Sequence, residues 1–86
     1  MAKTISEAEL RERFGNNLKI IRTIKRMTQD ELAALSGVTN QSISYYETGK
    51  RNVTLFHAIS IAAALGVELN YLLSENLYIG ASNEND

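Results

Sequence analysis

The chain has 86 residues, of which 44% are hydrophobic and 22% charged, and a chain this short forms one small domain with a thin core. It contains no cysteine and one histidine, which excludes a disulfide scaffold and leaves too few ligands for a metal cluster. No window approaches the roughly 20 apolar residues of a membrane span, and the start of the chain lacks the apolar core of a signal peptide. We therefore expect a soluble, cytoplasmic protein with no membrane partner, metal or cofactor.

The formal net charge is only −1, but the charges are unevenly distributed along the chain. Residues 13–53 hold seven basic and three acidic side chains, which gives +4, and residues 54–86 hold four acidic and no basic ones, which gives −4. A basic half is a weak sign of nucleic-acid binding, since solvated helix faces are also often rich in Lys and Arg.

Helix-capping signals recur at short intervals, and strand-like alternation does not persist, so the sequence predicts an all-α fold. The first helix begins with a capping box, in which Ser6 and Glu9 each accept a hydrogen bond from the other's backbone amide. We expect this helix to continue to about Arg26. Its inward stripe is formed by Phe14, Leu18 and Ile21 and is widened by Ile20 and Ile24.

Two short helices are predicted next. A second capping box at residues 28–31 begins a helix of about eight residues, which ends at Gly37, a residue that tolerates the left-handed conformation. Thr39 is the predicted cap of a third helix over residues 40–47, which ends before Gly49. The second and third helices are therefore joined by a very short turn.

The remaining elements are also helical. Thr54 is the predicted cap of a fourth helix over residues 55–65, whose small and apolar composition is that of a buried central element. Gly66 ends it, and residues 68–73 form a short fifth helix that returns leucines to the core. The polar tail beyond contains one apolar island at residues 77–79, which is either a disordered remnant or a segment that docks in the same chain or at a dimer interface.

The turn between the second and third helices has a specific residue pattern. Ala33 is small where the helices cross, Gly37 can take a positive φ, Val38 closes the turn and Ile43 fills the space between the helices. This pattern resembles the helix-turn-helix of the Cro and phage-repressor family, also called the xenobiotic-response-element class. The resemblance implies a compact five-helix DNA-binding domain with the helix-turn-helix at the second and third helices.

The resemblance also sets the expected domain limits and two departures from the family pattern. The family often has proline at the position of Val53 and a small polar cap at the position of Glu68, so we expect softer helix boundaries there. The chain divides into an N-terminal extension with the start of the first helix (1–12), the helix-turn-helix domain (13–73) and an acidic, polar tail (74–86).

The predicted third helix has two distinct faces. At 100° per residue, Ile43, Tyr46 and Glu47 face inward. The outward face carries amides and hydroxyls but no charge, as base edges in a major groove require, whereas a solvated face normally carries Lys or Glu. An ordinary polar surface is the competing interpretation. The resemblance assigns base reading to Asn40, Gln41, Ser44 and Tyr45, with Gln41 suited to adenine and Tyr45 to a thymine methyl group or a phosphate.

Contacts to the DNA backbone are expected on both elements next to the third helix. The amides at the start of the second helix form a ready anion site, and the family binds phosphate with the residue at this position. The loop that follows the third helix lies on the other side. The resemblance therefore assigns backbone contacts to Gln29, Thr48, Lys50, Arg51 and Asn52.

Glu47 is expected to face inward, where an unpaired carboxylate would cost several kcal/mol. Arg22 lies about 40° from Leu18 on the inward stripe of the first helix, and the resemblance implies an ion pair at these two positions. We therefore interpret the pair as structural rather than as a DNA contact. His57 has no Cys, Asp or second His at catalytic or ligand spacing and is interpreted as a surface residue.

The leading hypothesis is a sequence-specific double-stranded DNA-binding transcriptional regulator, and specifically a repressor. One recognition helix of about eight residues reads too few bases for useful specificity, which predicts a homodimer on a dyad-symmetric operator. The resemblance places the dimer contact near the fourth and fifth helices, which favours Phe56 and Tyr71. The alternative is a protein–protein adaptor of the same fold with little base readout. No catalytic group or small-molecule ligand is evident, so an enzyme is not expected.

Overall fold

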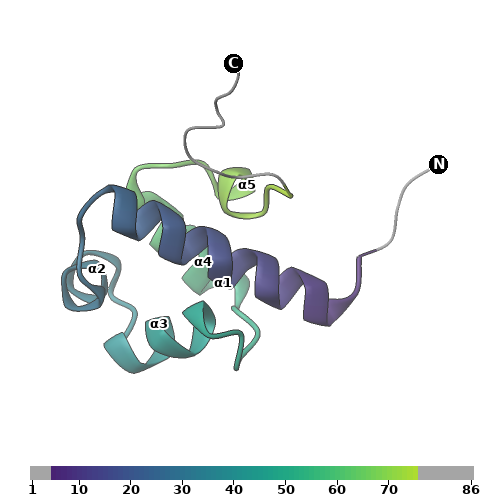
Figure 1. Ribbon diagram of the computed structural model, residues 1–86. Helices are drawn as coiled ribbons and strands as arrows, with labels where there is room; N and C mark the ends of the chain where they lie inside the picture. The colour runs from purple at the N-terminus through teal and green to yellow at the C-terminus, as the bar shows by residue number, and fades with distance from the viewer. Residues whose placement is uncertain (1–4, 76–86) are drawn as a thin grey trace, which may run out of the picture.

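The computed structural model describes residues 5–75, and this range contains five helices and no strand. The helices are α1 (Glu7–Ile24), α2 (Gln29–Ser36), α3 (Asn40–Glu47), α4 (Leu55–Leu65) and α5 (Leu69–Leu72). The long helix α1 crosses the molecule, with α2 and α3 on one side of it and α5 on the other (Figure 1). It packs against α3 and α5, while α4 packs against α2 and α5. The predicted all-α, five-helix fold is confirmed.

The predicted capping signals form. The hydroxyl of Ser6 accepts a hydrogen bond from the amide of Glu9, and the hydroxyl of Thr28 accepts one from the amide of Glu31, each at 3.0 Å. The carboxylates of Glu9 and Glu31 in turn accept hydrogen bonds from the amides of Ser6 and Thr28. Thr39 likewise caps α3 and Thr54 caps α4, so the starts of α1 to α4 are fixed by local hydrogen bonds. None of the helices in residues 5–75 is long and apolar enough to cross a membrane.

Two predicted helix ends need correction. The helix α1 ends at Ile24 rather than at about Arg26, because Arg26 itself has a φ of 56° and leaves the helical conformation. The helix α5 covers residues 69–72 rather than 68–73, and the side chain of Glu68 makes no cap hydrogen bond. Glu68 and Leu73 are the cap residues on either side of this helix, so the prediction was one residue too long at each end.

The hydrophobic core lies between α1 and the other four helices. The inward stripe that was predicted for α1 is buried, and so is Ile43, the residue expected to fill the space between α2 and α3. Together the buried apolar side chains are Phe14, Leu18, Ile21, Leu32, Val38, Ile43, Tyr46, Ala58, Ile61, Ala62, Leu65 and Leu72. Of the two residues expected to widen the stripe of α1, Ile20 is half-buried and Ile24 is exposed. The predicted apolar island at residues 77–79 lies outside the described residues.

The close approach of α1 to α3 depends on Gly15, which the sequence analysis did not single out. A Cβ atom at this position would lie 2.2 Å from the carbonyl oxygen of Tyr46. Such a contact is far inside van der Waals distance, and the opposing atom belongs to the backbone. Gly15 therefore sets how close α3 lies to α1.

A buried amide fixes the other side of α1. Asn17 is 5% exposed, and its Nδ2 donates to the carbonyl oxygens of Leu72 and Ser74, each at 2.8 Å. These bonds satisfy carbonyl groups at the end of α5, where a helix leaves its last acceptors without partners. Asn17 therefore holds α5 against α1.

Candidate nucleic-acid interface

The outward face of α3 is the accessible one. Asn40 and Gln41 are exposed, Ser44 and Tyr45 are half-buried, and the inward side chains of α3 are buried in the core. The four residues expected to read bases therefore share one accessible surface without a formal charge. This is the surface that a major groove would meet if α3 entered it.

Side-chain contacts order this face. Nε2 of Gln41 donates to the hydroxyl of Tyr45 at 3.2 Å, and the guanidinium of Arg51 lies 4.5 Å from the centroid of the Tyr45 ring. The same guanidinium makes a long hydrogen bond of 3.4 Å to the hydroxyl of Ser42. Arg51 therefore lies along α3 rather than extending away from it, and Gln41, Tyr45 and Arg51 form one continuous row.

The side chain of Asn40 is oriented by α2. Its Nδ2 donates to the carboxylate of Asp30, which lies in the first turn of α2. The contact depends on the angle between α2 and α3, which no local sequence pattern encodes. One donor of the Asn40 amide is thus used within the protein.

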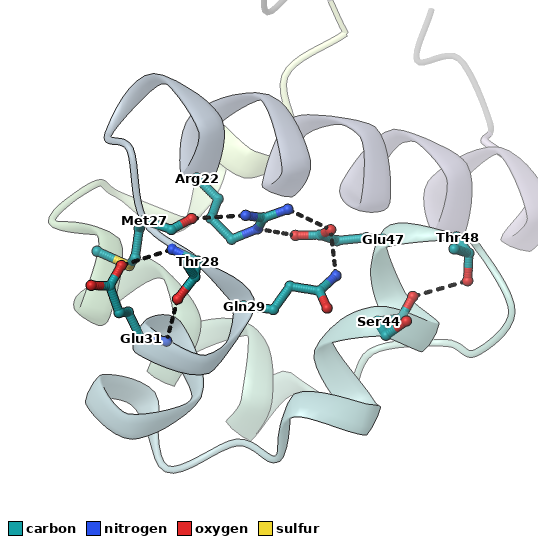
Figure 2. Close-up of polar contacts among 8 residues, drawn as sticks. All are labelled: Arg22, Met27, Thr28, Gln29, Glu31, Ser44, Glu47 and Thr48. Atoms are coloured by element: carbon teal, nitrogen blue, oxygen red, sulfur yellow. Dashed lines mark hydrogen bonds and ion pairs between the residues drawn. The ribbon is translucent and has the colours of Figure 1, made fainter.

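Arg22 and Glu47 come together as a bidentate ion pair (Figure 2). Nε of Arg22 lies 2.6 Å from one carboxylate oxygen and Nη2 lies 3.0 Å from the other, while Nη1 donates to the carbonyl oxygen of Met27 at 2.7 Å. The side chains are 15% and 3% exposed, respectively. The hydrogen bond to Glu47 raises the pKa of Arg22, although burial acts in the opposite direction. The pair joins α1, α3 and the turn before α2.

Gln29 is attached to this ion pair. Its Nε2 donates to Oε1 of Glu47 at 2.9 Å, as Figure 2 shows. Gln29 is predicted from the sequence to contact a phosphate, but one of its amide hydrogens is directed at Glu47. The second amide hydrogen and the first backbone amides of α2 remain as donors for an anion.

Thr48 uses its hydroxyl hydrogen within α3. Its Oγ1 donates to the carbonyl oxygen of Ser44 at 2.9 Å, at the end of the helix (Figure 2). A hydroxyl has one hydrogen to donate, so Thr48 in this arrangement has none to offer a phosphate oxygen. The geometry therefore favours a capping role for Thr48 over the backbone contact that the sequence analysis assigned to it.

The loop after α3 places Lys50, Arg51 and Asn52 at the surface. Gly49, with a φ of 71°, reverses the chain there. Arg11 reaches this loop from α1, because its Nε donates to the carbonyl oxygen of Gly49 at 3.0 Å and its Nη1 to Oδ1 of Asn52 at 2.9 Å. Sequence reasoning missed Arg11, which gave no signal because its partners are about 40 positions away.

His57 is not the surface residue that the sequence analysis took it to be. It is half-buried, and its Nδ1 lies 2.6 Å from the hydroxyl oxygen of Tyr46, with the two rings edge to face. The buried phenol thereby obtains a polar partner, as buried Tyr hydroxyls usually do. Burial raises the pKa of Tyr46, although the charge of Arg51 acts in the opposite direction. His57 therefore connects α4 to α3.

Known proteins resemble this chain over most of its length. Residues 18–72 match the helix-turn-helix family HTH_3. An uncharacterized HTH-type transcriptional regulator, y4dJ of Sinorhizobium fredii, is 39% identical over 59 residues, which cover 69% of this chain and 77% of that protein. Control protein C.MunI of a Mycoplasma species is 38% identical over 68 residues, which cover 78% and 92%. The restriction-modification controller protein C.AhdI from Aeromonas hydrophila superposes with a TM-score of 0.70 at 37% identity, covering 72% of this chain and 94% of that chain.

Proposed function

We propose, since this chain belongs to the HTH_3 helix-turn-helix family, that it is a sequence-specific DNA-binding regulator that represses transcription as a homodimer on a dyad-symmetric operator. Membership confirms the resemblance to Cro and phage-repressor helix-turn-helix proteins. Its named relatives are transcriptional regulators and controllers, which agrees with the expectation that the chain is not an enzyme. The observation that carries the proposal is the ordered, uncharged outward face of α3 beside a basic loop.

In this proposal α3 enters the major groove and its amides and hydroxyls meet the base edges. Gln41 carries the donor and acceptor that an adenine edge requires, and Tyr45 presents an aromatic ring to a thymine methyl group. Asn40 and Ser44 complete the reading surface. The contact between Gln41 and Tyr45 restricts both side chains before DNA is bound, which lowers the entropy cost of ordering them in the complex.

Phosphate contacts come from the two elements next to α3. Lys50, Arg51 and Asn52 lie in the loop after it, and Gln29 lies at the start of α2 beside the backbone amides of that helix. Such contacts fix the register of a protein on DNA without reading the sequence. Substitution of a base-reading residue should therefore affect DNA binding differently from substitution of a phosphate-binding residue.

Gln41→Ala should cost about 1 to 3 kcal/mol on the preferred operator and leave binding to random duplex nearly unchanged, because it removes a contact to base edges. Lys50→Ala should weaken operator and random duplex alike, and should reduce the slope of log K against log salt by about one unit for each phosphate that the variant no longer binds. The measurement is a titration of each variant on operator and scrambled duplex at three salt concentrations.

The matched control for this titration is Lys19→Ala, which removes the same charge from an exposed position of α1. It should change the salt slope less than Lys50→Ala does. Equal losses on both duplexes for Gln41→Ala would mean that the outward face of α3 does not read bases. The protein–protein adaptor would then become the better explanation of this fold.

Dimerisation is proposed through the exposed apolar surface of α4 and α5. Phe56 is 76% and Tyr71 50% exposed, and Leu55 and Ile59 on α4 add apolar surface that the sequence analysis did not assign. Exposed apolar groups gathered on one element are typical of a protein interface. A two-fold dimer would present two copies of α3 to successive major grooves of an operator.

Phe56→Ser should shift the chain from dimer to monomer in sedimentation equilibrium and weaken operator binding, because it removes apolar area from the proposed interface. Leu35→Ser is the matched control, since Leu35 is 64% exposed on α2, outside this surface. A wild-type chain that sediments as a monomer on operator DNA would contradict the dimer. An equal effect of Phe56→Ser and Leu35→Ser on the sedimentation equilibrium would contradict the proposed interface.

A further inference from the structure

Arg11 of α1 makes side-chain hydrogen bonds to the loop after α3. Its planar guanidinium makes two bonds at once, to the carbonyl oxygen of Gly49 at 3.0 Å and to Oδ1 of Asn52 at 2.9 Å. The side chain is half-buried. These two acceptors lie on either side of Lys50 and Arg51, so the bonds enclose the segment that carries the positive charges.

This segment is also connected to the end of α3. Gly49 takes a left-handed conformation, and the amide of Lys50 donates to the carbonyl oxygen of Tyr45 at 2.9 Å. These contacts reverse the chain, and beyond Lys50 the side chain of Arg51 joins the loop to α3, at the hydroxyl of Ser42 and over the ring of Tyr45. The bond from Arg11 to Asn52 restrains this second part of the loop.

We propose that Arg11 is a positioning residue for DNA binding, which holds the loop at residues 49–52 so that Lys50 and Arg51 meet the phosphates without a further ordering cost. The inference rests on the proposed function. A lysine could supply the same charge at this position but not the two-pronged donor geometry, because its ammonium is a single point on a flexible stem. The fork of Arg11, rather than its charge, is the property that the loop requires.

A direct contact from Arg11 to phosphate is the competing explanation, since a guanidinium has five donor hydrogens and the two loop bonds use only part of them. The two roles differ in their coupling to the loop. A residue that acts through Lys50 and Arg51 loses its effect when those two side chains are removed, whereas an independent phosphate contact keeps its effect.

The experiment is a double-mutant cycle in DNA affinity with the full chain, on its selected operator and on scrambled duplex. It uses Arg11→Met, the loop variant that combines Lys50→Ala with Arg51→Ala, and all three changes together. Arg11→Met should weaken binding to both duplexes about tenfold in the wild-type background. In the loop variant, Arg11→Met should weaken DNA binding by less than about twofold. Thermal melts establish that each variant is folded at the temperature of the titration.

Two further variants separate charge from geometry. Arg11→Lys should bind about as weakly as Arg11→Met, because the ammonium cannot hold both acceptors. Arg13→Met is the matched control, since Arg13 lies on the same helix and lines a different hollow, with Asn16 and Glu75, and it should change affinity less than twofold.

The outcomes distinguish this inference from the proposed function. An equal loss from Arg11→Met in both backgrounds, or full affinity in Arg11→Lys, would overturn the positioning role while leaving DNA binding intact. A wild-type chain that binds no duplex at all would overturn the proposed function and the role of Arg11 with it. The inference would be supported if Arg11→Met weakened DNA binding only in the wild-type background and Arg11→Lys did not restore the affinity.

Discussion

Arg22→Met and Glu47→Gln should each lower the free energy of unfolding by about 3 kcal/mol, because each change leaves a polar partner inside the protein without its counterpart. The side chain of Glu47 is 3% exposed, and after loss of Arg22 its carboxylate would keep the hydrogen bond from Gln29 but not its counter-ion. After loss of the Glu47 charge, the Arg22 guanidinium would keep its bond to Met27 but not its counter-ion. Chemical denaturation of each variant measures the effect.

The double variant provides the sharper test of this pair. Arg22→Met combined with Glu47→Gln removes both charges, so it should destabilise the protein by clearly less than the sum of the two single changes. Lys19→Met is the matched control, because it removes an exposed charge from α1 and should change stability by less than about 0.5 kcal/mol. Additive effects in the cycle would mean that the two residues are not energetic partners.

Gly15→Ala should destabilise the protein by about 1 to 3 kcal/mol, although alanine is the better residue in an isolated helix by up to about 1 kcal/mol. The added Cβ would lie 2.2 Å from the carbonyl oxygen of Tyr46, so α3 must move away from α1. Backbone atoms at the end of a packed helix cannot rotate out of the way as a flexible side chain can. Thermal and chemical denaturation report the change.

Asn16→Ala is the control for this substitution, because Asn16 is the exposed neighbour of Gly15 on α1. There the helix preference for alanine should act alone and leave stability unchanged or slightly increased. If Gly15→Ala were as stable as the wild type, the close approach of α1 to α3 would not depend on a glycine.

The helix starts could be predicted because the interactions that fix them are local. Ser6 and Thr28 each bond an amide three residues further along, and that spacing is visible in the sequence. The faces of α3 follow from the helical period, which places Tyr46 inward and Gln41 outward. Both kinds of prediction need only the residues of one helix.

The features that sequence reasoning missed depend on contacts between distant segments. Gly15 is required by the backbone of α3, Asn17 by the end of α5 and Arg11 by the loop after α3. From the sequence alone, each of these residues would be predicted to lie on an exposed face of a helix, because its packing partner is not known. His57 was misplaced for the same reason, since its partner is the phenol of Tyr46.

One helix end was missed for a local reason. Arg26 takes the left-handed conformation that glycine adopts at Gly37 and Gly66. Left-handed residues other than glycine are uncommon, so the sequence carried no stop signal at this position. The hydrogen bonds of Gln29 and Thr48 were also missed, because both side chains bond to α3 and were expected to contact phosphate instead.

The measurement that tests the central claim most directly is selection of binding sites by the wild-type chain from a pool of random duplex DNA. If α3 reads bases from a two-fold dimer, the selected sequences should share a dyad-symmetric consensus, with half-site centres about 10 base pairs, or one helical turn, apart. The same selection with Gln41→Ala should lose the base preference at one position in each half-site. A pool in which no sequence is enriched by the wild-type chain would contradict base reading by α3.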